Sequence, residues 1–362
     1  MIPLALSAQS DGLAPYVTRL RRQRASNPAD SWCLMSTDTK SLWCGAHGLV
    51  EIDHPASALE GDVILVNPAG ERIERVLRAG SPHNSMLVTE RCDQLCLMCS
   101  QPPKKSHVDR FDLLKQACLL AEPSATIGIS GGEPTLYKAQ LFDMVEQVLQ
   151  ARPDLHFHIL SNGQHFGADD IGRLSAPLWQ KVVWGIPVYA SDPVLHDRIV
   201  GKAGAFERLH ESFDHLLLSG ARLELRTVLL ADNLAGLPRL ARHITILLSH
   251  AEQWSLMGLE NIGFARNRWS ELYPDIRSNF APVGQALDIA TLHGLNARLF
   301  NTPLCHIPPA FRHHAVASIS DWKQRFGLKC EACAAKPDCS GFFEWHPDEL
   351  LDQVSPISKR EI

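Results

Sequence analysis

The chain is organised around Thr89-Glu90-Arg91-Cys92-Asp93-Gln94-Leu95-Cys96-Leu97-Met98-Cys99-Ser100, in which three cysteines follow the spacing C-x3-C-x2-C. The apolar run at residues 86–88 predicts a strand that ends where this loop begins. Thiolates are soft ligands that select iron–sulfur clusters or zinc, and one short loop can wrap three of them around a cluster. Three ligands leave one metal position open to a small molecule. A zinc site with His107 as a nearby ligand, or three unrelated buried thiols, are the alternative interpretations.

A second motif follows one strand and helix later, in Ile127-Gly128-Ile129-Ser130-Gly131-Gly132-Glu133-Pro134-Thr135. The short apolar strand at its start is predicted to end in a Gly-Gly-Glu turn. Gly131 and Gly132 allow the backbone to approach a ligand closely, and Glu133 can bind a ligand ammonium. The two motifs together favour a cluster that binds a small molecule over a zinc site.

The pair of motifs resembles that of the radical S-adenosylmethionine (SAM) superfamily. The resemblance implies that Cys92, Cys96 and Cys99 hold a [4Fe–4S] cluster whose open iron binds the amino and carboxylate groups of SAM. It also implies that the turn ending in Glu133 and Pro134 contacts SAM, with the methionine ammonium on Gly131, Gly132 and Glu133. Met98 stands where the superfamily usually has an aromatic residue, and this adaptable apolar side chain can still pack near adenine.

Apolar strands and amphipathic helices alternate from residue 85 onward. We predict strands near 85–89, 125–130, 155–160, 181–188, 222–230 and 253–260, and helices near 108–121, 138–151, 204–219, 234–248 and 281–293. Nearly continuous apolar strands indicate an α/β fold of parallel strands covered by helices. The resemblance implies a partial (β/α)6 TIM-like barrel with its chemistry on the loops after the strands. A doubly wound open sheet fits the pattern almost as well.

Three polar residues near later strands are further candidate SAM contacts. Asn162 and Ser191 can donate hydrogen bonds to ribose or carboxylate oxygens, and Arg226 on the fifth strand can pair with the SAM carboxylate. Each also has a structural interpretation. Asn162-Gly163 is a turn signal, Ser191-Asp192-Pro193 can cap a helix, and Arg226 can form a structural ion pair.

A second set of cysteines lies near the C-terminus and consists of Cys305, Cys330, Cys333 and Cys339. Four thiols in one segment can complete a ligand shell. Structural zinc sites favour two C-x-x-C pairs, and Cys305 stands alone, so the spacing favours iron–sulfur, with zinc as the alternative. Resemblance to radical enzymes with an auxiliary cluster implies a second [4Fe–4S] cluster. The remaining Cys33, Cys44 and Cys118 are expected to be core thiols.

Four regions are predicted from these patterns: a β-rich appendage at 1–80, the radical SAM core at 81–300, the auxiliary cluster region at 301–343 and a tail at 344–362. Within the appendage, strands are predicted near 32–35, 48–52, 62–66 and 72–77, with a hairpin turn at 67–70. The appendage could recognise a substrate or cap the core.

Composition places the chain among globular proteins, because 45% of its 362 residues are hydrophobic and 21% are charged. Its net charge of −5 argues against nucleic-acid binding, so we expect Arg19, Arg21, Arg22 and Arg24 on a solvated helix face. No apolar run approaches a membrane span and the first ten residues lack a signal peptide's pattern, which predicts a cytoplasmic protein with free thiols.

Several stretches resemble the HxsC family of radical SAM maturases, which belongs to the His-Xaa-Ser repeat peptide system. They are Cys96 to Lys104, Trp184 to Pro187, Leu256 to Glu260, Gly263 to Ala265 and Ile319 to Lys323. This resemblance implies an enzyme that cleaves SAM reductively and modifies a ribosomally made peptide. It also implies a companion radical SAM maturase and an electron donor such as flavodoxin or ferredoxin. The alternatives are an enzyme acting on a purine or pterin type of small molecule, and a non-catalytic iron–sulfur scaffold.

Overall fold

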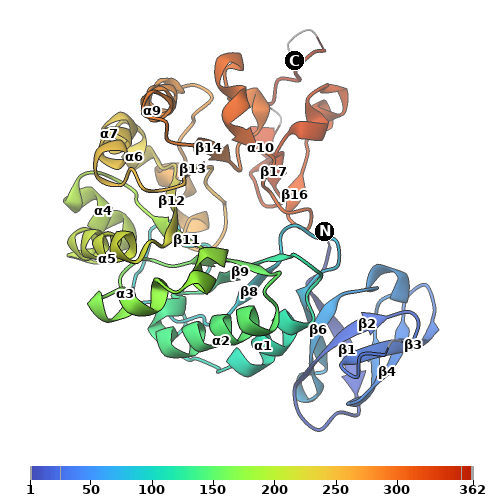
Figure 1. The fold of residues 1–362 in the computed structure, drawn as a ribbon. Helices are drawn as coiled ribbons and strands as arrows, with labels where there is room; N and C mark the ends of the chain where they lie inside the picture. The colour runs from blue at the N-terminus through green and yellow to red at the C-terminus, as the bar shows by residue number, and fades with distance from the viewer. Residues whose placement is uncertain (1, 25, 352, 360–362) are drawn as a thin grey trace. The chain divides into compact units, whose positions relative to one another are not determined.

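The chain divides into two compact units, which are shown as one ribbon in Figure 1. The computed structural model describes residues 2–24, 26–351 and 353–359. The N-terminal unit comprises Ile2–Thr89 and Ser106–Ile159, and the C-terminal unit comprises Glu90–Lys105 and Leu160–Ile362. The division therefore falls inside the predicted core of residues 81–300. The three-cysteine loop belongs to the C-terminal unit, whereas the Gly-Gly-Glu turn belongs to the N-terminal unit.

The N-terminal unit begins with a closed barrel of seven short strands in the order β1-β5-β4-β3-β2-β6-β7. The strands are β1 (Ala5–Ser10), β2 (Tyr16–Arg21), β3 (Asp30–Ser36), β4 (Ser41–Gly45), β5 (Gly48–Ile52), β6 (Val63–Asn67) and β7 (Arg72–Leu77). Leu20, Trp43, Ile52 and Ile64 fill its core and are each fully buried. The four strands predicted here correspond to β3, β5, β6 and β7, and the predicted turn joins β6 to β7. Strands β1, β2 and β4 were not predicted.

The arginine cluster corrects one prediction, because Arg19 and Arg21 lie on strand β2 and not on a helix. Thr18 and Leu20 of this strand are buried, and β2 pairs with β6 and β3. Burial against neighbouring strands therefore outweighs the local helix propensity of arginine. Arg19 Nε donates to Asp30 Oδ1 on β3 at 2.9 Å.

The remainder of the N-terminal unit is the start of a parallel sheet with two helices. It consists of β8 (Ser85–Leu87), α1 (Phe111–Leu119), β9 (Thr126–Ser130), α2 (Lys138–Ala151) and β10 (His156–Leu160). Strand β9 pairs in parallel with both β8 and β10. Helix α1 buries Phe111, Leu114 and Cys118, which confirms the prediction that Cys118 is a core thiol.

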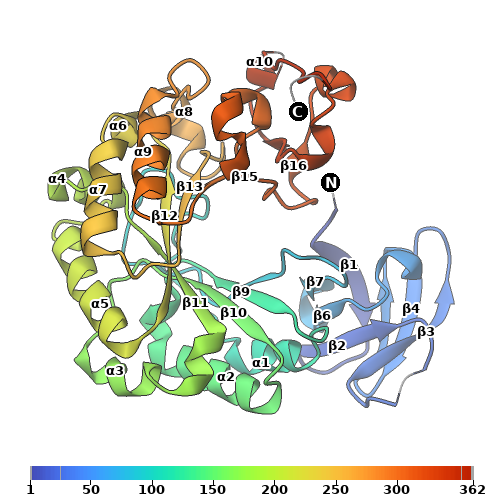
Figure 2. The same cartoon turned by 45° about the horizontal axis from the view of Figure 1, so that its top comes forward.

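The C-terminal unit continues the same alternation of strand and helix. Its elements are α3 (Ala168–Leu174), β11 (Val182–Pro187), α4 (Pro193–Val200), α5 (Ala205–Ser219), β12 (Arg222–Val228), α6 (Ala231–Leu234), α7 (Leu237–Leu247), β13 (Gln253–Met257), α8 (Trp269–Leu272), α9 (Ala281–Leu292), β14 (Ala297–Phe300) and β15 (Ala315–Val316). Strands β11 to β15 pair in parallel in chain order, and α5, α7 and α9 run beside them (Figure 2).

The hydrogen-bonded order of the parallel strands follows the chain from β8 to β15. All six strands predicted from residue 85 onward are present, and β14 and β15 extend the sheet to eight. The fold is therefore α/β with a parallel sheet, as predicted. After β15 the chain has little regular structure apart from the antiparallel pair β16 (Gln324–Arg325) and β17 (Phe342–Phe343) and the short α10 (Asp348–Leu351). Among the described residues, no helix combines the length and apolar character needed to cross a membrane.

Candidate cluster and cofactor site

The three-cysteine loop is held between the backbones of two glycines in the C-terminal unit. Leu95 N–H donates to Val200 O at 3.0 Å, at the end of α4. The next residue, Gly201, has φ +65°, and a Cβ there would lie 2.6 Å from Leu95 O. At the other end of the loop, a Cβ on Gly263 would lie 2.2 Å from Cys99 O, and its φ is +59°. A larger residue does not fit at either position, so these glycines fix where the loop runs.

The thiols of the loop lie close enough to influence one another. Burial raises the pKa of the Cys96 thiol to about 12, and the neighbouring Cys99 and Cys92 raise it further. Burial also raises the pKa of Cys99, whose Sγ donates to Gln101 O at 3.1 Å. A metal centre removes this penalty because it stabilises the thiolate form directly. The loop thus places Cys92 and Cys99 near enough to Cys96 to oppose the ionisation of its thiol.

Asp93, which was not predicted, anchors the loop to the segment after β10. Its carboxylate accepts hydrogen bonds from Asn162 Nδ2 at 2.7 Å and Lys202 Nζ at 2.5 Å, and His165 Nε2 lies 3.3 Å away. Burial alone would raise the pKa of Asp93, but the hydrogen bonds from His165, Lys202 and Asn162 hold it well below its usual range. The only sequence signal was an acidic residue between two candidate ligands.

Asn162 was predicted as a SAM contact and is placed here by two protein partners. Besides its bond to Asp93, its Oδ1 accepts from Gln164 N at 3.0 Å. Gly163 has φ +71°, so Asn162-Gly163 is also the turn that the structural interpretation expected. Its role toward SAM stays a prediction.

Arg226 lies on β12, and its guanidinium forms a structural ion pair. Nη1 is 3.0 Å from a carboxylate oxygen of the buried Glu224, and Nη2 is 3.1 Å from Met257 Sδ. Ser255 Oγ donates to the same carboxylate of Glu224. This is the alternative that the sequence left open, and pairing with a SAM carboxylate stays a prediction.

Ser191 is half-buried just before α4, but it does not cap the helix. The N-terminal cap is Asp192, whose side chain accepts from Leu195 N at 3.0 Å. Asp192 therefore provides the helix cap that the structural interpretation of Ser191-Asp192-Pro193 expected.

Met98 and Tyr189 pack together under the cysteine loop. Met98 is 7% exposed and shares an apolar cluster with Tyr189, Ile199 and Leu259. Burial raises the pKa of the Tyr189 phenol well above 10, and the Cys96 thiolate raises it further, whereas Arg226 acts in the opposite direction. The Tyr189 phenol therefore lies within electrostatic reach of the thiols and of Arg226, which no local motif signalled.

The Gly-Gly-Glu turn of the N-terminal unit is pinned to the residue that follows β8. Gly132 N–H donates to Thr89 O at 2.9 Å, and a Cβ on Gly131 would lie 2.5 Å from the same oxygen. Glu133 is fully buried, and its Oε1 accepts from the backbone N–H and the hydroxyl of Thr135 at 2.9 and 2.5 Å. The carboxylate thus begins the 3-10 turn Pro134–Tyr137.

His107, the candidate zinc ligand, lies in the N-terminal unit beside this turn. Its Nδ1 is 3.0 Å from Thr89 Oγ1, and its ring stacks on Tyr137 with 3.8 Å between centroids. The imidazole therefore has a packing role of its own within this unit.

The four C-terminal cysteines line one small cavity of about 20 Å³. Leu304 N–H and Gly341 N–H each donate to Cys339 Sγ at 3.4 Å. Burial raises the pKa of Cys305 to about 11, and Cys339 and Cys330 raise it further. Backbone donors aimed at sulfur are typical of cluster ligands, because they tune the reduction potential.

The predicted tail takes part in this cavity. Val354 and Ile357 line it, and Ile357 N–H donates to Cys333 Sγ at 3.3 Å. The sequence placed these residues outside the cluster region because they carry no ligand side chains.

No disulfide joins any of the ten cysteines, all of which lie in the described part of the chain. Within the described ranges, no three His, Cys, Asp or Glu side chains converge as ligands of one metal ion would.

Comparisons with known proteins give matches among solved structures alone. No family model matches the chain, and no curated protein matches it. SuiB of Streptococcus suis bound to S-adenosylmethionine is 16% identical, with a TM-score of 0.45, and the match covers 63% of this chain and 49% of SuiB. A radical SAM methyltransferase from Sphaerobacter thermophilus is 14% identical, with a TM-score of 0.45 and coverage of 75% and 77%. Native anSMEcpe with bound AdoMet is 11% identical, with a TM-score of 0.44 and coverage of 75% and 80%. The chain spans about half the length of SuiB, and likewise 50% of a histidine-tagged anSMEcpe with bound AdoMet.

Proposed function

We propose that this chain is a radical SAM enzyme that modifies a ribosomally made peptide. The observation that carries the proposal is the short loop that bears Cys92, Cys96 and Cys99, whose course is fixed by the close backbones of Gly201 and Gly263. Three thiols on one short loop fit a [4Fe–4S] cluster with one open iron, because the cluster supplies the positive charge that the thiolates need. The Gly-Gly-Glu turn is hydrogen-bonded to Thr89, which directly precedes the loop in the sequence. In this proposal the turn binds the amino-acid part of SAM.

The chemistry belongs to the bound groups, and the chain positions them. When bound, they let one electron from a donor such as flavodoxin or ferredoxin break the bond between the SAM sulfur and C5′, giving methionine and a 5′-deoxyadenosyl radical that takes a hydrogen atom from the substrate.

The residues of the chain have separate tasks in this proposal. Asp93 holds the cysteine loop in place, and Met98 and Tyr189 exclude water beneath it. A carboxylate has about four acceptor sites, so Glu133 can accept from the SAM ammonium in addition to Thr135.

We extend the proposal to a second [4Fe–4S] cluster in the C-terminal cavity. Cys305, Cys330, Cys333 and Cys339 all line that cavity, and backbone N–H groups already face two of the sulfurs. Four thiolates leave no iron open, so this site would relay electrons or hold substrate and would not bind SAM.

A peptide substrate and a companion radical SAM maturase are proposed from the HxsC resemblance. Two of the resembling stretches lie at the site, which supports this choice. Phe264 N–H donates to Cys99 O at 2.9 Å, and the Leu256 to Glu260 stretch contains the end of strand β13.

Anaerobic assay of the reconstituted protein tests the proposal. With SAM and dithionite, it should form 5′-deoxyadenosine, detected by mass spectrometry. Co-expression with candidate His-Xaa-Ser peptides and the companion maturase should change the peptide mass. Protein that carries iron but forms no 5′-deoxyadenosine would refute the radical SAM proposal. An unchanged mass across all candidate peptides would refute the peptide proposal alone.

A further inference from the structure

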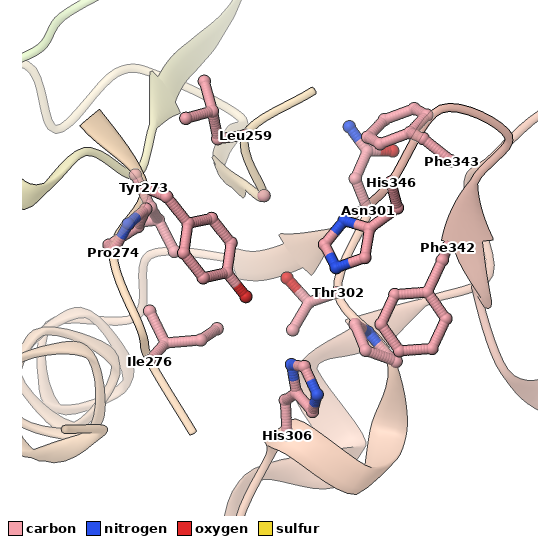
Figure 3. A pocket seen from close by; sticks show the side chains of 13 residues that line it. Leu259, Tyr273, Pro274, Ile276, Asn301, Thr302, His306, Phe342, Phe343 and His346 are labelled. Atoms are coloured by element: carbon pink, nitrogen blue, oxygen red, sulfur yellow. The ribbon is translucent and has the colours of Figure 1, made fainter. Parts of the chain in front are cut away.

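A cavity of about 40 Å³ lies at the carboxyl ends of three neighbouring strands of the C-terminal unit (Figure 3). Leu229 follows β12, Leu259 follows β13 and Thr302 follows β14, and all three line the cavity. Parallel sheets bind their ligands at this edge. A cavity this size holds about three waters or a group of similar size.

The cavity lies one side-chain layer from each set of thiols. On one side, Leu259 packs in the apolar cluster that contains Met98 of the cysteine loop. On the other side, Pro303 and Phe342 line both this cavity and the cavity of the four C-terminal cysteines. A group bound here would therefore sit between the two candidate cluster sites.

Two buried imidazoles in this cavity each have one nitrogen without a hydrogen-bond partner among the residues that the structure describes. His306 and His346 are each 8% exposed, and the Nε2 atom of each has no hydrogen-bond partner. Figure 3 shows both rings facing the same space as the hydroxyls of Tyr273 and Thr302. Buried polar atoms in native proteins are nearly always paired, so two unpaired nitrogens in one cavity indicate a missing binding partner.

The lining favours an uncharged partner. No Asp, Glu, Lys or Arg is among the described residues that line the cavity, so an ion there would lack a counter-charge. Burial lowers the pKa of His346 to about 4, with smaller effects from His306 and Arg325. An imidazole nitrogen either donates or accepts a hydrogen bond, so two such nitrogens in one cavity suit a group that does both.

The rings are held in place by aromatic packing. The His346 ring lies 4.9 Å from that of Phe342 and 6.1 Å from that of Tyr273, and the His306 ring lies 5.6 Å from Phe342. Such packing fixes the directions of the nitrogens, which is what a selective site requires.

We propose that His306 and His346 bind a small neutral group of the substrate that carries both a hydrogen-bond donor and an acceptor, a primary amide or a hydroxyl. The two histidines are positioning residues. They select which group of the substrate is bound between the three-cysteine loop and the four C-terminal cysteines. This inference rests on the proposed function in one respect only, namely that the peptide is the molecule that carries the bound group.

The test uses the reconstituted full chain and three probes of similar size: acetamide, acetate and methylammonium. Saturation-transfer NMR, which observes the probe, should show saturable binding of acetamide at pH 7.5 and little of either ion. His306→Phe and His346→Phe keep a ring for packing but remove the nitrogens, and each should weaken acetamide binding at least about fivefold. His293→Phe, at an exposed position, should bind acetamide like wild type.

His346→Gln restores an amide near the lost nitrogen and should recover part of the acetamide binding. Equal binding of acetate and acetamide, absence of acetamide binding to wild type, or unchanged binding in both Phe variants would overturn the inference. If the Phe variants fail to fold, two measurements still test the inference. They are the preference of wild type among the three probes and the binding of acetamide to His346→Gln. Formation of 5′-deoxyadenosine without any acetamide binding would refute this inference alone. Acetamide binding without formation of 5′-deoxyadenosine would refute the radical SAM proposal alone.

Discussion

Asp93 is the residue on which the geometry of the cysteine loop depends most. Asp93→Asn keeps the shape but removes the charge that Lys202 and Asn162 bind. Hydrogen bonds to charged groups contribute about 1.5–3 kcal/mol each, so we expect the free energy of unfolding to fall by about 2–3 kcal/mol at pH 7. Chemical denaturation measures this difference, and Asp112→Asn, at an exposed site, is the control.

The pH dependence of that difference follows from the lowered pKa of Asp93. A depressed folded-state pKa stabilises the protein above the unfolded pKa of about 4 and loses this effect as the pH falls toward the folded value. Wild type should therefore be more stable than Asp93→Asn from pH 8 to about 5, and the two should converge below about pH 4. A difference that vanished at neutral pH would show that the Asp93 charge does not hold the loop.

Glu133 allows a second prediction at this scale. Glu133→Gln retains an acceptor for Thr135, so the turn should persist, but the SAM ammonium loses a charged partner worth about 1.5–3 kcal/mol. Calorimetry should show SAM affinity reduced about 10-fold to 100-fold, with iron content unchanged as the control. Equal affinity in both proteins would place the ammonium elsewhere.

Among the elements, the turn at Gly263 sets the position of the third cysteine. Gly263 and Gly294 both have positive φ, +59° and +73°, but only Gly263 has a close neighbour, because no atom lies within 4 Å of a Cβ on Gly294. Gly294→Ala should cost about 1–2 kcal/mol of unfolding free energy from backbone strain alone. Gly263→Ala adds a clash with Cys99 O and should also lower the iron loading of the three-cysteine loop. Equal iron loading in the two variants, measured after reconstitution, would mean that Gly263 does not position the loop.

Element by element, the sequence predicted what local spacing encodes. Strands β8 to β13 were found because each carries several apolar residues, adjacent or alternating with polar ones, whereas β14 and β15 have four and two residues and leave almost no pattern. Strand β2 was missed because its arginines resemble a helix surface. The cysteine ligands were found by spacing. Asp93 and His346 were not, because Asp93 meets Lys202 across 109 residues and His346 joins the cavity through packing.

At the scale of the whole molecule, the N-terminal barrel supports the sheet that follows it in the same unit. Helix α1 packs on β2 and β6, and Arg110 of the segment before α1 pairs with Glu74 of β7 at 2.6 Å. Removing residues 2–77 would expose this face of α1. We expect the shortened protein to be insoluble or to melt well below wild type, as soluble yield and thermal unfolding would show. A stable shortened protein that still cleaves SAM but fails to modify peptide would instead assign the barrel to substrate recognition.

The most direct test of the central claim is electron paramagnetic resonance of the reduced protein with and without SAM, combined with iron analysis. Wild type should bind about eight irons, because its seven ligand thiolates divide three and four. Replacing Cys92, Cys96 and Cys99 by Ala should leave about four irons and a signal that SAM does not change. Replacing Cys330 and Cys333 by Ala should leave about four irons and a signal that SAM shifts. Zinc in place of iron, or a SAM-induced shift in the variant that lacks Cys92, Cys96 and Cys99, would contradict the account.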